Sequence, residues 1–147
     1  SGKGYLLTVV DRKLRTAFIE KVYPVSIANM EKAFLKIKKR YPELRTVTTD
    51  NDLLFVHHKR LEQLLGVQIY FCHPYHSWEK GSIENVNGEI RRYIPKGSGL
   101  SRYTPRQLRI IEDKLNDRFM ECLNFATPKE KLAQHRRRKN RSGARWK

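Results

Sequence analysis

The sequence has few cysteines, few acidic residues and no long apolar segment, and each shortage excludes a class of protein. Two cysteines, Cys72 and Cys122, cannot form a disulfide framework and are typical of a reducing compartment. The longest nearly uncharged apolar run, 66–72, is far shorter than the ~20 residues that cross a bilayer. No signal peptide is recognisable. We therefore expect neither a secreted scaffold nor a membrane protein.

The shortage of acidic residues leaves a strongly basic chain. Its 147 residues include 31 Lys and Arg against 15 Asp and Glu, a formal net charge of +16. Seven basic residues follow position 135, yet the rest of the chain is basic as well, which favours a polyanionic partner such as DNA. We expect the tail from Arg136 to be disordered on its own, and the last helix to end before Pro128.

Apolar patterning predicts one three-layer α/β domain, in which helices cover a mixed sheet. We expect a core over residues 1–130 and a basic tail over 131–147. Cys122 is expected in the core. The predicted strands are 5–10, 16–22, 44–49 and 67–72, and the predicted helices are 26–41, 55–65, 82–93 and 104–123.

Two carboxylates are the candidates for chemistry. Asp50 follows a predicted strand, and Glu84 begins a predicted helix 33 intervening residues later. Such carboxylates suit Mg²⁺ or Mn²⁺, and a pair of these ions can assist phosphodiester transfer. The alternative is that Asp50 forms a turn and Glu84 is merely solvated.

The helix around Glu84 combines groups that handle phosphate. At the spacing i, i+3 and i+7, Glu84, Asn87 and Arg91 share one face. An acid, an amide and a guanidinium on one face are what a site for metal and phosphate requires.

The segment YFCHPYHSWEKGSIENVNGEIRRYIPKG resembles the signature of the insertion-sequence-thirty family of bacterial transposases. The resemblance extends from about Tyr5 to Glu130. The residues that match the pattern are Trp78, Gly81, Glu84, Asn85, Asn87, Gly88, Arg91, Pro95 and Lys96.

The resemblance implies a DDE enzyme with an RNase H-like core that cuts DNA and joins it to target DNA. In that reading Asp50 and Glu84 are the second and third acids of a metal-binding triad that holds Mg²⁺ or Mn²⁺. It also implies a bacterial cytoplasmic, nucleoid-associated protein that forms homo-oligomers on DNA. The residues expected to contact DNA are Trp78, Lys80, Asn85, Asn87, Arg91, Arg92 and Lys96.

The sequence departs from the family at three places. The strand containing Asp11 matches the second strand of the core, so we expect the first strand, and the first acid with it, to be missing; the alternative is that Asp11 substitutes for that acid. The absence of that central strand should weaken the sheet and leave the chain inactive. Asp52 replaces the glycine that usually follows the second acid, and Asn116-Asp117-Arg118 differs from the family's Asn-Arg-Pro-Arg.

Two other interpretations stay open. Cys72, His73 and His76 have a zinc-like spacing, but without a second close pair of ligands a structural role is favoured. Trp78 could anchor a core or stack on DNA. The alternative function for the chain is a non-catalytic basic protein that binds nucleic acid.

Overall fold

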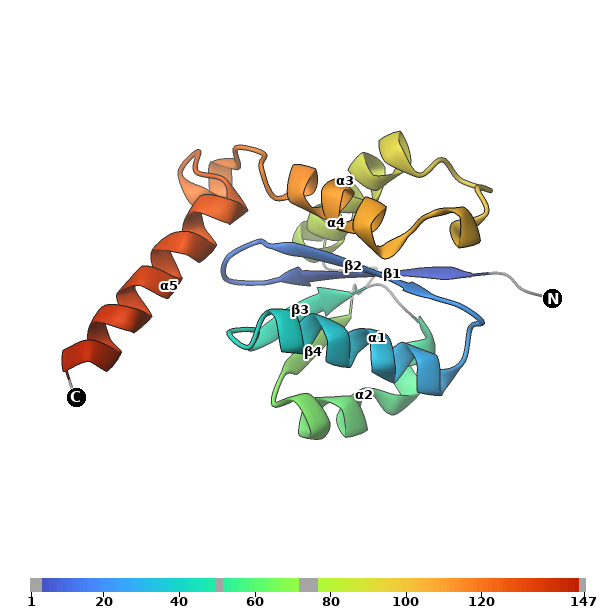
Figure 1. The fold of residues 1–147 in the computed structure, drawn as a ribbon, viewed down its shortest axis with the longest axis horizontal. Helices are drawn as coiled ribbons and strands as arrows, with labels where there is room; N and C mark the ends of the chain where they lie inside the picture. Colours follow the sequence, from blue (N-terminus) through green and yellow to red (C-terminus); the bar gives the residue numbers. More distant parts are fainter. Residues whose placement is uncertain (1–3, 50–51, 72–76, 146–147) are drawn as a thin grey trace.

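The computed structural model describes residues 4–49, 52–71 and 77–145, without the side chains of 52–56, 77–82 and 142–145. Within these ranges the chain forms a four-stranded mixed sheet with helices on both faces (Figure 1). The elements are β1 (Tyr5–Asp11), β2 (Ala17–Val22), α1 (Ile27–Arg40), β3 (Thr46–Thr49), α2 (Asp52–Leu65), β4 (Gln68–Phe71), α3 (Ser77–Tyr93), η1 (Leu100–Arg102), α4 (Pro105–Leu115), η2 (Glu121–Leu123) and α5 (Pro128–Arg145).

The sheet has the strand order β2-β1-β3-β4, and its central ladder is short. β1 pairs antiparallel with β2 along nearly its whole length, and β3 pairs parallel with β4. Between these two halves, β1 and β3 are antiparallel and pair only at Val10–Thr48 and Asp11–Val47. This mixed order is compatible with the RNase H-like core that the family resemblance implies.

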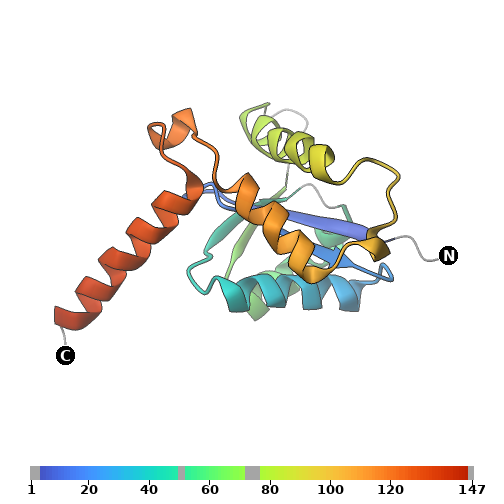
Figure 2. The ribbon, with the colours of Figure 1, turned by 45° about the horizontal axis from the view of Figure 1, so that its top comes forward.

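The sheet separates two apolar cores. Because successive side chains on a strand point to opposite faces, Leu7 and Val9 of β1 pack towards α1 and α2, whereas Leu6 and Val10 pack towards α3 and α4. Figure 2 shows these two helical layers on either side of the strands. The result is the three-layer α/β arrangement expected from the sequence.

The free edge of β2 is closed by side chains of α4 rather than by another strand. The Glu112 carboxylate accepts the Ile19 N–H at 2.9 Å, and the Asn116 amide both accepts from and donates to the Ala17 backbone. Glu112 is 3% exposed and pairs with Arg40 of α1 at 2.7 Å. Asn116, the residue just before the sequence departs from the family's Asn-Arg-Pro-Arg, therefore has a structural role here.

The prediction of one helix from Thr104 to Leu123 is wrong. Thr104 does begin α4 with a capping box, but the helix ends at Leu115. The reason is that Asn116 is held against β2, after which the chain turns back through left-handed residues at 124 and 125. Phe119 is consequently 77% exposed, and Cys122, expected in the core, is exposed.

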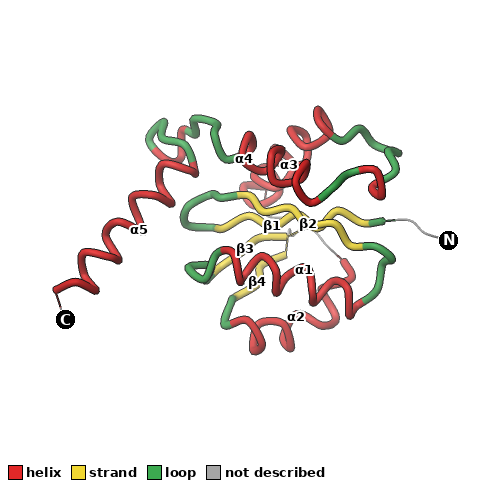
Figure 3. Tube along the Cα trace, viewed as in Figure 1, coloured by secondary structure: helices red, strands yellow, loops and turns green. Residues whose placement is uncertain are grey.

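The prediction that the last helix ends before Pro128 and that the tail from Arg136 is disordered is also wrong. α5 begins at Pro128 and continues to Arg145, across the expected boundary at residue 130 (Figure 3). Thr127 and Glu130 exchange hydrogen bonds at its start, which satisfies free N–H groups of the first turn. None of the helices in the described ranges is long and apolar enough to cross a membrane.

Candidate nucleic-acid interface

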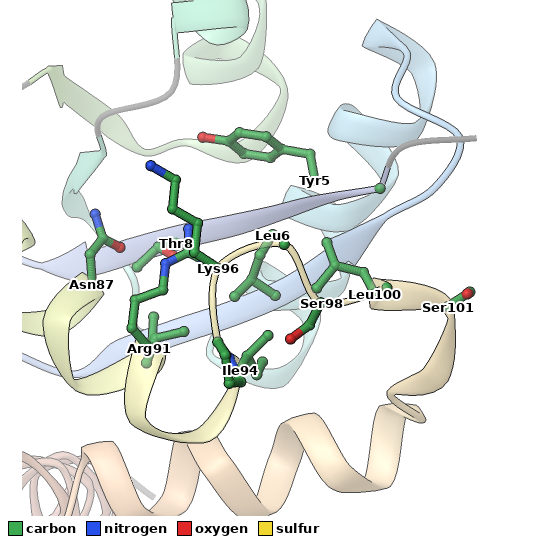
Figure 4. Close-up of a pocket in the computed structure, with 15 residues that line it drawn as sticks. Tyr5, Leu6, Thr8, Asn87, Arg91, Ile94, Lys96, Ser98, Leu100 and Ser101 are labelled. Atoms are coloured by element: carbon green, nitrogen blue, oxygen red, sulfur yellow. The ribbon is translucent and has the colours of Figure 1, made fainter. Parts of the chain in front are cut away.

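A cavity of about 550 Å³ lies between β1, the second half of α3 and the loop that leads to η1. Asn87 and Arg91 of α3 and Lys96 of the loop line this cavity (Figure 4). All three were predicted from the sequence to contact DNA. Arg91 and Lys96 are exposed, so their positive charges are available to a ligand that enters from solvent.

The packing of α3 explains why these polar side chains face the cavity. Ile83, Val86, Ile90 and Ile94 form its buried stripe and pack in the core shared with β1 and α4. The helix thereby fixes the neighbouring face, which carries Asn87 and Arg91. Ile90 and Ile94 also supply an apolar wall of the cavity.

Glu84 is exposed and lies one helical turn before Asn87 on the same side of α3. α3 contacts both β1 and β3. β3 ends at Thr49, whose hydroxyl donates to the Thr8 carbonyl at 3.1 Å, and the predicted partner of Glu84, Asp50, lies outside the described residues. Among the described residues, no three His, Cys, Asp or Glu side chains form a metal-binding group.

Two of the predicted contacts lie away from the cavity. Asn85 lines a second cavity beside Phe119 on the other side of α3. Arg92 is exposed and pairs with Glu89 at 3.5 Å, and Glu89 also pairs with Arg118 at 3.9 Å. The structure therefore brings Asn87, Arg91 and Lys96 together and separates Asn85 and Arg92 from them.

The remaining predicted residues are placed only in part. Trp78 and Lys80 belong to α3, which begins at Ser77 rather than at the predicted residue 82, but their side chains are not described. Cys72, His73 and His76 lie outside the described residues. Their zinc-like spacing therefore stays a prediction from sequence.

Asp11 is built into the turn between β1 and β2. Its carboxylate accepts the N–H groups of Lys13 and Leu14 at 2.8 and 3.1 Å, and burial raises the pKa of its side chain despite these bonds. It pairs with Val47 near the start of β3, whereas Asp50 follows the end of that strand. Asp11 thus lies at the opposite end of β3 from the candidate catalytic edge.

Sequence reasoning missed one wall of the cavity. The sequence predicts only a loop over 97–103, yet Ser98 and Ser101 in this segment line the cavity opposite α3. The signal was the Pro95-Lys96-Gly97 run, because proline ends a helix and Gly97, with φ +87°, turns the chain back.

The comparisons with known proteins find transposases among the relatives of this chain. The chain is 41% identical over 133 residues to the transposase for insertion sequence element IS4351 of Bacteroides fragilis. The aligned stretch covers 90% of the chain and 41% of that relative. It is 35% identical over 129 residues to the transposase InsI for IS30A of Escherichia coli, covering 86% of the chain and 34% of the relative. This stretch of sequence belongs to the IS30-type transposases.

A more distant relative extends the likeness to a viral protein. The putative integrase ORF3 of Spiroplasma virus SpV1-R8A2 B is 26% identical over 136 residues, or 90% of the chain. No family model matches the chain. The chain spans 42% or less of the length of each of these three relatives, so it corresponds to one region of such a transposase.

Proposed function

We propose that this region is the catalytic core of an IS30-type transposase and that it binds the DNA on which transposition acts. The observation that carries the proposal is the set formed by Glu84, Asn87 and Arg91 on one side of α3, beside a cavity that Lys96 closes. Two of the three relatives named above are transposases, and their names support the same function for this region.

Arg91 and Lys96 would contact phosphate oxygens, because guanidinium and ammonium groups are the usual partners of a DNA backbone. The Asn87 amide would contribute a hydrogen bond at the same cavity. No base-specific contact is needed for this role, since backbone contacts place a duplex without reading its sequence. Homo-oligomers on DNA are part of the same proposal.

Asp50 and Glu84 would hold Mg²⁺ or Mn²⁺. Glu84 fits this role because it is an exposed carboxylate on the side of α3 that also presents Asn87 and Arg91, and hard cations prefer carboxylate oxygens together with substrate phosphates. When bound, such ions polarise the phosphodiester and activate the attacking oxygen. The protein's part is to position Glu84 on a helix fixed by its buried isoleucines.

A second candidate function is DNA binding without catalysis. The position of Asp11 favours it for the isolated chain, because that carboxylate is committed to a turn near the start of β3. The two functions share the cationic cavity and differ only in the chemistry at Glu84.

Arg91→Ala and Arg92→Ala form a matched pair that tests the cavity, because each removes one exposed arginine from the same helix. If the cavity binds DNA, Arg91→Ala weakens binding to a short duplex in fluorescence anisotropy more than Arg92→Ala does. Equal effects would mean that only the overall charge matters. No measurable binding by the parent chain would reject the proposal.

A further inference from the structure

α5 has two different faces. Taking about 100° of turn per residue, one face contains Leu132, His135, Arg136 and Lys139, which lie against the body of the domain. The opposite face carries Arg137, Arg138 and Arg141 within an arc of about 100°. The basic stretch is therefore not uniform: Arg136 and Lys139, although exposed, lie beside the body of the domain, whereas the other face points away from it.

The inner face fixes the direction of the helix. Arg136 Nε donates to the Glu43 carboxylate at 2.5 Å, and its guanidinium lies 5.3 Å from the centre of the Tyr41 ring. Tyr41 in turn packs on Phe18 of β2, with ring centres 4.3 Å apart. Although burial alone would raise the pKa of Glu43, the hydrogen bond and charge of Arg136 lower it, so the pair stays ionised at neutral pH.

The outer face carries positive charge that no acid offsets. Arg137, Arg138 and Arg141 are exposed and form no ion pair with the described residues, and the sequence has no acidic residue after Glu130. By contrast, Arg40 of α1 pairs with Glu112 and Glu20. Arg137 and Arg141 are one turn apart, about 6 Å along the helix.

This outer face is remote from the candidate catalytic edge. α5 lies against Asp11, Glu43 and Thr46, at the start of β3, and projects away from the sheet in Figures 1 and 2. Asp50 would follow the other end of β3. A ligand on α5 therefore does not occupy the cavity beside α3.

We propose that the outer face of α5 binds the phosphate groups of duplex DNA beyond the segment held at the catalytic edge. The Arg136–Glu43 pair holds α5 in the orientation that this contact requires. The proposal rests on the proposed function, because a transposase core binds long duplexes. On such a duplex, two separate contacts to the backbone both contribute to the affinity. A duplex fits this face because regularly spaced phosphates match a row of charges on a rigid helix.

The first test replaces three charges at a time in the 147-residue chain. Arg137→Ala/Arg138→Ala/Arg141→Ala is compared with Lys32→Ala/Lys36→Ala/Lys39→Ala on α1, which removes the same charge from another exposed surface. The probe is a random-sequence duplex of about 30 base pairs, titrated at several salt concentrations. We expect the α5 variant to bind roughly tenfold or more weakly, with a log–log salt slope reduced by about 2.7, and the α1 variant to change little.

The second test separates the direction of the helix from its charge. Glu43→Gln keeps every basic residue and raises the net charge by one, so bulk attraction predicts tighter binding to the duplex. If the Arg136–Glu43 pair aims α5, the variant binds more weakly instead. Lysine in place of the three outer arginines (Arg137→Lys/Arg138→Lys/Arg141→Lys) should retain most of the affinity that the alanine variant loses, since phosphate contact requires charge at these positions.

The outcomes distinguish this inference from the proposed function. Three results would overturn the role of α5: normal DNA binding by the α5 alanine variant, equal losses in both triple alanine variants, or tighter binding by Glu43→Gln. None of them would argue against DNA binding at the cavity beside α3. If Arg91→Ala loses duplex binding and the α5 alanine variant does not, the role of α5 is likewise overturned and the proposed function stands. If the parent chain binds phosphatidylserine vesicles more strongly than the duplex, and the α5 alanine variant loses that binding, α5 would instead be assigned to a membrane surface.

Discussion

The carboxylate of Glu112 accepts the backbone N–H of Ile19 at 2.9 Å, so a side chain of α4 takes the place that a neighbouring strand would fill at the edge of β2. The same carboxylate pairs with Arg40 at 2.7 Å and is 3% exposed. One group thus joins α4, β2 and α1. An open strand edge is a template for aggregation, and this contact closes it.

We expect Glu112→Ala to lower the free energy of unfolding by about 3 kcal/mol, because it leaves the buried Ile19 N–H without its acceptor and leaves the Arg40 guanidinium with Glu20 as its remaining acidic partner. Urea denaturation measures the change. Asp113→Ala on the same helix is the control: it removes the exposed Asp113–Lys129 pair and should cost about 1 kcal/mol or less. A similar small loss in Glu112→Ala would show that the network contributes little.

We expect Asp11→Asn to become increasingly stabilising as the pH rises. The pKa of Asp11 is raised above its ordinary 3.8, so the folded state holds its proton more tightly, and stability falls as the pH rises from about 3.8 through the folded pKa. The amide oxygen of Asn can still accept from Lys13 and Leu14. Thermal melts of both proteins between acidic and neutral pH test this, and a difference that shrinks with rising pH would contradict it.

Glu84→Gln should weaken Mn²⁺ binding roughly tenfold, about 1.4 kcal/mol, because the amide lacks the charge that a hard cation requires. Isothermal titration calorimetry of the 147-residue chain measures this. Glu89→Gln serves as the control, since Glu89 lies on the same helix but is engaged by Arg92 and Arg118. If both variants bind Mn²⁺ like the parent, Glu84 is not a ligand.

The chain should shift duplex DNA in a gel without cutting it in the presence of Mn²⁺. Asp11 is held in a turn near the start of β3, and the described residues contain no group of three side chains that could bind a metal. A supercoiled plasmid gives the readout, because a single nick relaxes it. Nicking that disappears in Asp11→Asn would assign a catalytic role to that residue after all.

Periodicity was sufficient to predict the elements whose faces differ clearly in polarity. In α1, the spacing of Met30, Phe34 and Ile37 gives the buried stripe, although Ile27 at its start is 46% exposed. In α3, the spacing of Asn87 and Arg91 was enough to predict that they share a face, and both line one cavity. Local spacing determines such positions because they depend only on the helix itself.

Features that depend on distant partners were not predictable in this way. Glu112 looks like a solvated charge in the sequence, and its burial follows from Ile19 and Arg40, which lie 93 and 72 positions away. α5 has too few apolar residues to suggest packing, yet Glu43 and Arg136 hold it on the domain. That Asp50 and Glu84 lie close enough to hold metal ions together remains a prediction from sequence, because Asp50 lies outside the described residues.

The short ladder between β1 and β3 has a consequence for the backbone amides of β1. In an antiparallel pair the backbone N–H and C=O groups of alternate residues point to the partner strand. The backbone groups of Leu7 and Val9 point to β2, whereas those of Leu6 and Thr8 point to the side of β3, which pairs with β1 at Val10 and Asp11. Within the described residues, we therefore expect the amide protons of Leu7 and Val9 to exchange with solvent more slowly than those of Leu6 and Thr8, even though β1 is second in the sheet. Since β1 and β3 are antiparallel, a further strand that entered beside Leu6 and paired antiparallel with β1 would run parallel to β3.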